Sequence, residues 1–297
     1  MANYTIRDLE RLSGIKAHTI RIWEKRYGLI EPERTSTNIR TYCDAELRKL
    51  LNVSILNKNG YKISRIANLS SEEISENINK LTETPTNTET QIENLAIAMI
   101  DLDEVKFEKI LTRAIIQMGF EEMVIKILNP FFHRIGIMWQ TGSINPAQEH
   151  FVSNLVRQKM LVAIDSQISG ESPDAKTFLL FLPEGEMHEL GLLFASYVIR
   201  KRGHKVIYLG QNVPFDDLID VERIRPCNYF LTSFTSSSFF DGGIRDFLAK
   251  LASLAPSQTI YAAGEQVADV DISKLGNVKY MATHEDFIRE LNYISSL

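Results

Sequence analysis

The first hydrophobic positions of the chain recur at helical spacing. Thr5 is followed three residues later by Asp8, which is the pattern of a capping box at a helix start. The apolar positions that follow on one face are Ile6, Leu9 and Leu12. The pair Ser13-Gly14 interrupts the pattern, so a helix of little more than two turns is expected here.

A second short helix is predicted over about 17–27, with Ile20 and Trp23 facing inward and Gly28 closing its end. Two short helices joined by a turn that contains glycine predict a helix-turn-helix, whose second helix enters the major groove of DNA. Residues 29–42 then read as a small hairpin, or wing, and residues 44–56 open another helix.

The middle of the chain is polar at first and then helical. Residues 82–90 are polar and β-branched, contain a proline and have no apolar periodicity, so a flexible linker is expected. From 91 to about 168 apolar residues recur at helical spacing, and the simplest architecture is a four-helix bundle.

The C-terminal half alternates apolar runs with helical patterns, which predicts an open parallel α/β sheet. The runs lie at 177–182, 203–210, 229–235 and 260–264. The predicted fold class is therefore multidomain, α plus α/β. Its parts are a winged-helix head at 1–75, a linker at 76–91, a four-helix bundle at 92–172 and a flavodoxin- or Rossmann-like domain at 173–297.

Composition adds a charge asymmetry to this picture. The apolar fraction of 44% and the charged fraction of 24% are ordinary for a soluble protein, and 297 residues suit two or three domains. Residues 1–65 hold 13 Lys/Arg against 7 Asp/Glu, a net +6, and the remainder holds 20 against 31, a net −11. A basic head on an acidic body indicates that only the head binds a polyanion.

Other composition signals exclude several classes of protein. No apolar run approaches the length of a membrane span, and no signal-peptide pattern opens the chain, so a cytoplasmic location is expected. Cys43 and Cys227 lie far apart, which indicates neither a disulfide framework nor a zinc site. No nucleophile–base pairing or phosphate loop is recognisable, so the chain is not expected to be an enzyme.

The candidate DNA contacts are the polar residues of the second helix and of the wing. A single arginine is more often a solvated surface charge, but the helix, the wing and the basic bias together favour DNA binding. The candidates are His18, Thr19, Arg21, Lys25, Arg26, Tyr27, Arg34, Arg40 and Tyr42.

The stretch 19–30 with Pro32, Arg34 and Arg40-x-Tyr42 resembles the MerR family of transcription regulators over about the first 70 residues. The usual glycine pair at the wing tip is Thr37-Asn38 here, and asparagine tolerates the left-handed conformation better than threonine. Many MerR proteins dimerise through a long coiled coil, but no sustained heptads follow the head. The contact within a dimer or tetramer is therefore expected elsewhere.

A second candidate site follows the first strand of the C-terminal half, where Glu186-x-His188-x-x-Gly191 opens a helix. Ligands bind at the carboxyl edge of open α/β sheets. An imidazole there can offer one nitrogen to a metal while the carboxylate two residues earlier holds the other N–H. For this motif alone, an ordinary loop histidine at a helix start is the commoner interpretation.

The motif resembles the cobalamin-binding domains, in which this histidine replaces the cofactor's own base as the lower cobalt ligand. The resemblance implies that Thr232 or Ser233 stands for the family's serine. Ala263-Gly264 stands for a Gly-Gly pair, whose small side chains admit the nucleotide tail. The methyl group of Ala263 narrows the space between the strands into which the nucleotide tail would fit.

Trp139 and the pair Glu149-His150 resemble the Trp-x9-Glu-His arrangement of cobalamin-dependent photoreceptor regulators of the CarH and LitR type. The resemblance implies that the bundle caps the corrin, with these three residues beside the upper ligand, expected to be adenosyl. The alternative is that Trp139 belongs to the bundle core and Glu149-His150 is an ordinary helix start. Gln140 follows the tryptophan where some members carry a histidine that binds cobalt after illumination. Because glutamine is a poor cobalt ligand, water or His150 is expected instead.

These features together predict a transcriptional regulator, most simply a repressor, whose oligomeric state and DNA avidity depend on bound adenosylcobalamin and on light. Two alternatives stay open. The C-terminal domain could bind no cofactor and act as a protein-interaction module, or it could be a corrinoid carrier of a methyltransferase, which would make the chain part of an enzyme.

Overall fold

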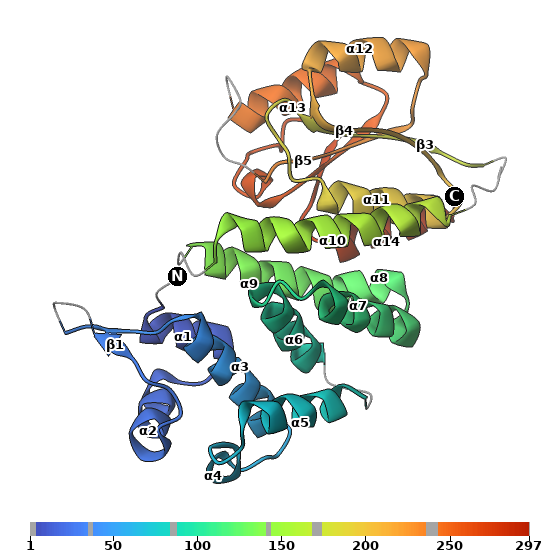
Figure 1. Ribbon diagram of the computed structural model, residues 1–297. Helices are drawn as coiled ribbons and strands as arrows, with labels where there is room; N and C mark the ends of the chain where they lie inside the picture. The colour runs from blue at the N-terminus through green and yellow to red at the C-terminus, as the bar shows by residue number, and fades with distance from the viewer. Residues whose placement is uncertain are drawn as a thin grey trace. The chain divides into compact units, whose positions relative to one another are not determined.

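The computed structural model describes residues 4–34, 38–83, 88–140, 144–167, 174–235 and 243–296. The chain forms two compact units, Met1–Leu155 and Val156–Leu297, which are described separately (Figure 1). Among the described residues, no helix is both long and apolar enough to cross a bilayer.

The head begins with the two predicted helices. Helix α1 spans Ile6–Ser13 and α2 spans Ala17–Tyr27. The Thr5 hydroxyl accepts from the Asp8 amide and the Asp8 carboxylate accepts from the Thr5 amide, which confirms the capping box. Gly14 and Gly28 close the helices with φ of 71° and 59°, a left-handed conformation that glycine adopts at low cost. Ile20 and Trp23 are buried, as predicted.

The wing and its supporting helices follow. Strands β1, Glu33–Arg34, and β2, Arg40–Thr41, pair antiparallel. Asn38 has φ of 63°, as expected for the residue that takes the left-handed position, while Thr37 lies outside the described residues. Helices α3, Asp44–Lys58, and α4, Ile63–Ile66, complete the core of the head.

The predicted linker requires a correction, because most of it is helical. Helix α5 spans Ser71–Glu83 and α6 spans Thr88–Ile100, so only 84–87 lie outside the described helices. Ser70 and Glu73 form a capping box at the start of α5. Thr90 and Gln91 at the start of α6 resembled a linker but are buried. Glu89 binds Lys58 of the head at 2.5 Å, a distant contact that local periodicity cannot indicate.

Four helical stretches occupy the region in which the sequence predicts a four-helix bundle. The first is α6 and the second is α7, Glu104–Met118. The third runs through α8, Phe120–Met123, a π-helical turn η1, Val124–Leu128, and α9, Asn129–Gln140. The fourth is α10, Pro146–Asp165, which continues into the second unit. Phe107 and Phe131 meet in the core with ring centroids 5.7 Å apart.

The second unit is a five-stranded parallel sheet in the order β4-β3-β5-β6-β7. The strands are β3, Thr177–Pro183, β4, Lys205–Val213, β5, Tyr229–Ser233, β6, Thr259–Ala263, and β7, Val278–Met281. Continuous apolar runs form these strands because helices cover both faces of the sheet. This is the flavodoxin-like order, with its topological switch point between β3 and β5.

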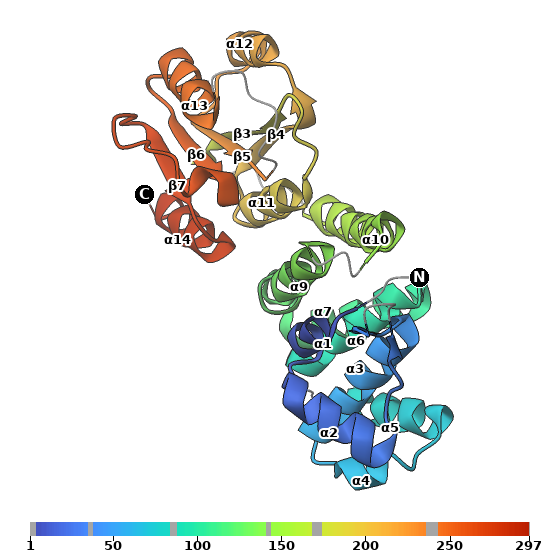
Figure 2. The same cartoon turned by 90° about the vertical axis from the view of Figure 1, so that its left-hand side faces the viewer.

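Helices lie on both sides of that sheet (Figure 2). Helices α11, Leu190–Lys201, and α14, His284–Ile294, lie on one face, and α12, Phe215–Ile224, and α13, Gly243–Leu254, lie on the other. A single 3-10 turn, η2, Glu265–Val267, follows β6. The fold class predicted from the sequence is confirmed.

Candidate functional site

The loop after β3 holds His188 against a buried carboxylate. Glu186 is 1% exposed, and its Oε1 accepts from the Nδ1–H of His188 at 2.6 Å and from two backbone amides, those of Met187 and His188. Because Nδ1 donates to Glu186, the lone pair resides on Nε2. The His188 side chain is 61% exposed, so Nε2 is accessible to a metal from solvent.

Glu186 also joins the two loops at the switch point. Its second oxygen, Oε2, accepts from the backbone N–H of Thr235, just after β5, at 2.7 Å. A carboxylate with several N–H donors can stay ionised although it is buried. The predicted pair of Glu186 and His188 is thus brought together at the edge of the sheet where ligands of this fold bind.

Strand β4 supports the loop through contacts that sequence analysis missed. The Asn212 Oδ1 accepts from the Gly185 amide at 2.8 Å, and Gln211 Nε2 donates to the Met187 carbonyl at 2.6 Å. Asn212 has φ of 55°, a conformation that asparagine tolerates better than most residues. The only sequence feature that could have indicated this support is an asparagine, Asn212, next to the end of a predicted strand.

Glu189 holds a second cluster that the sequence did not indicate. This carboxylate, 7% exposed, accepts from Arg157 Nε at 2.5 Å and from the Tyr208 hydroxyl at 2.9 Å. Burial raises the pKa of Tyr208, and the bond to Glu189 raises it further, so the hydroxyl stays protonated and donates. The residue after His188 is therefore fixed from two sides.

The ends of β5 and β6 contain the small residues predicted to admit a nucleotide tail. Ser233 is paired in register with Ala263, and both are half-buried. Thr232 is fully buried, and its Oγ1 has no hydrogen-bond partner among the described residues. An unsatisfied buried hydroxyl is costly and suits a site completed by a polar ligand group. The residues present therefore fit a cobalamin tail.

Gly191 and Gly264, both predicted to belong to this site, differ in whether the protein's own packing requires a glycine. A Cβ on Gly264 would lie 2.2 Å from the Phe234 carbonyl oxygen, and its φ is 99°, so the protein's own backbone requires glycine. A Cβ on Gly191 would meet only His284 Nε2 at 3.6 Å, an ordinary contact. The protein's own packing does not require a glycine at 191, which suits close approach of a ligand.

No group of three or more His, Cys, Asp or Glu side chains within the described ranges could hold a metal ion.

In the first unit, Trp139 at the end of α9 is 51% exposed, so the alternative that it belongs to the bundle core is wrong. Early in α10, His150 Nδ1 lies 2.9 Å from a Glu149 oxygen, and the imidazole is 72% exposed. Ser153 donates to the other Glu149 oxygen. This Glu–His pair repeats the arrangement of Glu186 and His188, with Nε2 directed away from the carboxylate.

The candidate DNA contacts lie mainly on the surface of the head. His18, Arg21, Lys25 and Arg26 of α2 and Arg34 of the wing are exposed, and Thr19, Tyr27 and Arg40 are half-buried. Arg26 lies 5.4 Å from the Tyr27 ring centre, and Arg40 Nε lies 3.3 Å from Glu24.

The prediction that Tyr42 contacts DNA is wrong. Its side chain is 1% exposed and belongs to the core of the head. Its hydroxyl donates to Glu24 at 3.3 Å, and burial, reinforced by Glu24, raises the pKa of Tyr42 to about 12. A tyrosine beside a wing arginine resembles a phosphate contact in sequence. Its backbone instead pairs with Tyr4, which directs the ring inward.

We expect Tyr42→Phe to leave DNA affinity within about twofold while lowering the free energy of unfolding by about 1 kcal/mol, the value of one hydrogen bond. Arg21→Ala should weaken binding about tenfold, in the range of a base or phosphate contact. Fluorescence anisotropy with a DNA fragment selected by the protein, together with urea unfolding, checks both. Equal losses of DNA affinity would contradict the buried position of Tyr42.

Two protein-family models match parts of the chain. The MerR HTH regulatory-protein family matches residues 4–73, and the B12 binding domain family matches residues 91–163. The HTH-type transcriptional repressor CarH of Myxococcus xanthus is 30% identical over 261 residues, which are 85% of this chain and 85% of CarH. The repressor CarA of the same organism is 28% identical over 219 residues, 70% of this chain and 68% of CarA.

One solved structure supports the fold. The monomethylamine corrinoid protein of Methanosarcina barkeri superposes with a TM-score of 0.57 at 14% identity, over 71% of this chain and 100% of that protein. At this identity the likeness concerns the fold alone.

Proposed function

Because the chain belongs to the MerR family of transcriptional regulators that carry a cobalamin-binding domain, we propose that it is a repressor controlled by adenosylcobalamin and light. In the dark, the bound cofactor favours a self-associated form, a dimer or tetramer, that holds the operator. Illumination removes this preference. Two relatives, CarH and CarA, are transcriptional repressors, which supports repression rather than activation.

The observation that carries the proposal is the pair formed by Glu186 and His188. The carboxylate fixes the imidazole with Nδ1–H turned inward, so Nε2 is the nitrogen that would coordinate cobalt. Thr232, Ser233 and Gly264 would hold the nucleotide tail between β5 and β6. The orphaned Thr232 hydroxyl supports this assignment, because a tail group would satisfy it.

Trp139, Glu149 and His150 are proposed to enclose the upper ligand. An exposed indole next to a polar Glu–His pair suits a nucleoside, whose base is partly apolar and whose ribose forms hydrogen bonds. When bound, adenosylcobalamin supplies visible absorption and a cobalt–carbon bond that light breaks. After illumination, water or the His150 Nε2 would serve as a cobalt ligand, because Gln140 stands where some family members carry a histidine.

Self-association provides the link to DNA. A single head offers few phosphate contacts, among them Arg21, Lys25 and Arg34, and binds weakly alone. Joining several heads raises their effective concentration on neighbouring half-sites and increases avidity by about 10²–10⁴. A cofactor that favours the oligomer therefore favours repression.

Gly191→Ala tests the cofactor site without disturbing the fold. Since the new methyl group makes only an ordinary contact, we expect the melting temperature to stay within about 2 °C, which corresponds to about 1 kcal/mol or less. Cobalamin affinity should fall at least about tenfold, because the methyl group occupies space that the corrin needs. Spectroscopic titration and thermal melting of the same preparations separate the two effects. Unchanged affinity would place the corrin away from α11.

The proposal as a whole is tested by mixing the purified chain with adenosylcobalamin in the dark, recording the absorption spectrum and the molar mass, and repeating both after illumination. A histidine-ligated spectrum with a larger mass in the dark than in the light is expected. A protein that retains no corrin spectrum would instead be a regulator whose second unit is an interaction module. A retained spectrum with constant mass would leave a cobalamin regulator without a light response.

A further inference from the structure

Helix α6 buries an unusual number of polar side chains where it contacts the head. Glu93 is fully buried and Asn94 is 1% exposed. Thr90 and Gln91 are also buried. Glutamate is almost never fully buried without a partner. The partners of this carboxylate therefore indicate what the buried surface does.

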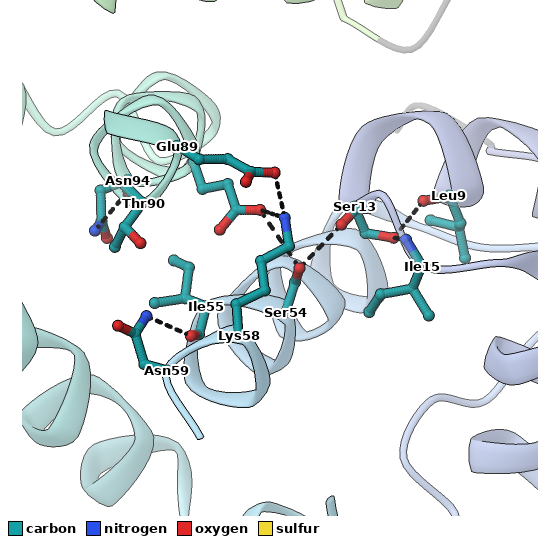
Figure 3. Close-up of polar contacts among 11 residues, drawn as sticks. Leu9, Ser13, Ile15, Ser54, Ile55, Lys58, Asn59, Glu89, Thr90 and Asn94 are labelled. Atoms are coloured by element: carbon teal, nitrogen blue, oxygen red, sulfur yellow. Dashed lines mark hydrogen bonds and ion pairs between the residues drawn. The ribbon is translucent and has the colours of Figure 1, made fainter. Parts of the chain in front are cut away.

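Those partners come from α3 of the head (Figure 3). Lys58 Nζ donates to Glu93 Oε1 at 2.8 Å and to Glu89 at 2.5 Å. The buried Ser54 hydroxyl shares its one proton between two acceptors, the Ser13 carbonyl at 2.9 Å and, more weakly, the same Glu93 oxygen at 3.4 Å. A chain of polar contacts thus runs from α6 through α3 to Ser13.

Ser13 lies in the turn of the helix-turn-helix. It is the last residue of α1, its hydroxyl donates to the Leu9 carbonyl at 2.6 Å, and it accepts from the Ile15 amide at 3.2 Å. Ile15 leads into α2, the proposed recognition helix. The position of Ser13 therefore influences the angle at which α2 leaves the turn.

Stability alone does not account for this carboxylate. Burial raises the pKa of Glu93, although Lys58 opposes the shift, so the folded protein bears a cost for keeping the group ionised. A well-packed apolar residue would often serve a purely structural contact equally well. A buried polar group of this kind is better suited to fixing one arrangement of two elements.

The contact between α6 and α3 has a cavity at its other end. There Arg48 of α3 binds Asp101, which follows α6, at 2.5 Å. A cavity of about 410 Å³ lies beside this pair, lined among others by Asn52, Ile97 and Lys106. The contact between α6 and α3 is therefore closely packed at the end of Glu93, whereas a cavity adjoins its other end.

We propose that Glu93 and Ser54 are positioning residues through which α6 sets the turn of the helix-turn-helix, so that changes in the bundle alter DNA binding. The inference rests on the proposed control by cobalamin. A change in the position of α6 is transmitted by Glu93 to Ser54, and the turn at Ser13 follows. The contact is a coupling element and touches neither DNA nor cofactor.

Four variants of the full chain separate coupling from general stability. Glu93→Met fills the space but offers no acceptor, and Lys58 keeps Glu89, so no buried cation loses its only partner. Glu93→Gln keeps one acceptor oxygen and is the conservative variant. Ser54→Ala removes the hydroxyl that links Glu93 to the Ser13 carbonyl. Asp101→Asn is the matched control, because it breaks a head–bundle ion pair that has no contact with the turn.

The coupling factor is the ratio of the DNA dissociation constants without and with adenosylcobalamin in the dark. For the unmodified chain it should be at least about 100-fold, because self-association alone contributes about 10²–10⁴. Glu93→Met and Ser54→Ala should lower this ratio at least about fivefold, the lower range of allosteric coupling, with an unchanged corrin spectrum and an unchanged molar mass in the dark, and the double variant should lower it no further. Glu93→Gln and Asp101→Asn should retain most of it. A normal ratio in Glu93→Met, or an equal loss in Asp101→Asn, overturns the inference.

Hydrogen exchange of the cofactor-free chain keeps this test separate from the proposed function. Glu93→Met should speed exchange of the Ile15 amide and of the start of α2, while Asp101→Asn should not. If the unmodified chain shows no cofactor-dependent ratio, the proposed function fails, and exchange alone decides the positioning role. Unchanged exchange in Glu93→Met then overturns it.

Discussion

His188→Ala is expected to weaken cobalamin binding at least about 100-fold and to abolish the histidine-ligated spectrum. Loss of an outer partner of a metal ligand already costs about 10–100-fold in metal affinity, and loss of the ligand itself should cost no less. The buried Glu186 would keep its backbone donors from Met187, His188 and Thr235, so the loop should fold. Spectroscopic titration in the dark measures the change.

His133→Ala is the control for that measurement. His133 is an exposed histidine of α9 that has no role in the proposed site. It should bind cobalamin with the affinity of the unmodified chain. If His188→Ala also kept both affinity and spectrum, the cobalt would not be bound through this loop.

Gly264→Ala is expected to have the largest effect on stability, lowering the free energy of unfolding of the second unit by roughly 2–6 kcal/mol. The positive φ contributes about 1–3 kcal/mol of strain, and overlap of the methyl group with the Phe234 carbonyl adds about 1–3 kcal/mol. The closest approach would be 2.2 Å to backbone, which cannot rotate away as a side chain can. Denaturant unfolding followed by the signal of this unit measures the loss.

Gly276→Ala serves as its control in the same unit. No atom lies within 4 Å of the added Cβ, so a change of less than about 0.5 kcal/mol is expected. Equal stability of the two alanine variants would mean that β5 and β6 do not approach each other as described.

The sequence predicted features whose causes are local. A carboxylate two residues before a histidine, directly after an apolar strand, predicted the Glu186–His188 pair, because both partners lie in one loop. Gly28 at a helix end and Asn38 at the wing tip were predictable for the same reason, since left-handed conformations favour few residue types.

Features that depend on distant partners were not predictable. Glu89 resembled part of a linker because its partner, Lys58, lies 31 positions earlier. Tyr42 resembled a DNA contact until its pairing with Tyr4 directed it inward. Asn212 supports the histidine loop only because β4 lies next to β3, which depends on the order of strands in the sheet.

The central claim is that one protein imidazole is the lower ligand of cobalt, and electron paramagnetic resonance of the bound Co(II) form tests it most directly. The chain is produced with ¹⁵N-labelled histidine as its only labelled residue and is loaded with unlabelled cofactor. Coordination through His188 predicts that each cobalt line splits into two, the pattern of a single ¹⁵N ligand. A splitting into three, from the ¹⁴N of the cofactor's own base, or no nitrogen splitting at all, would contradict the account.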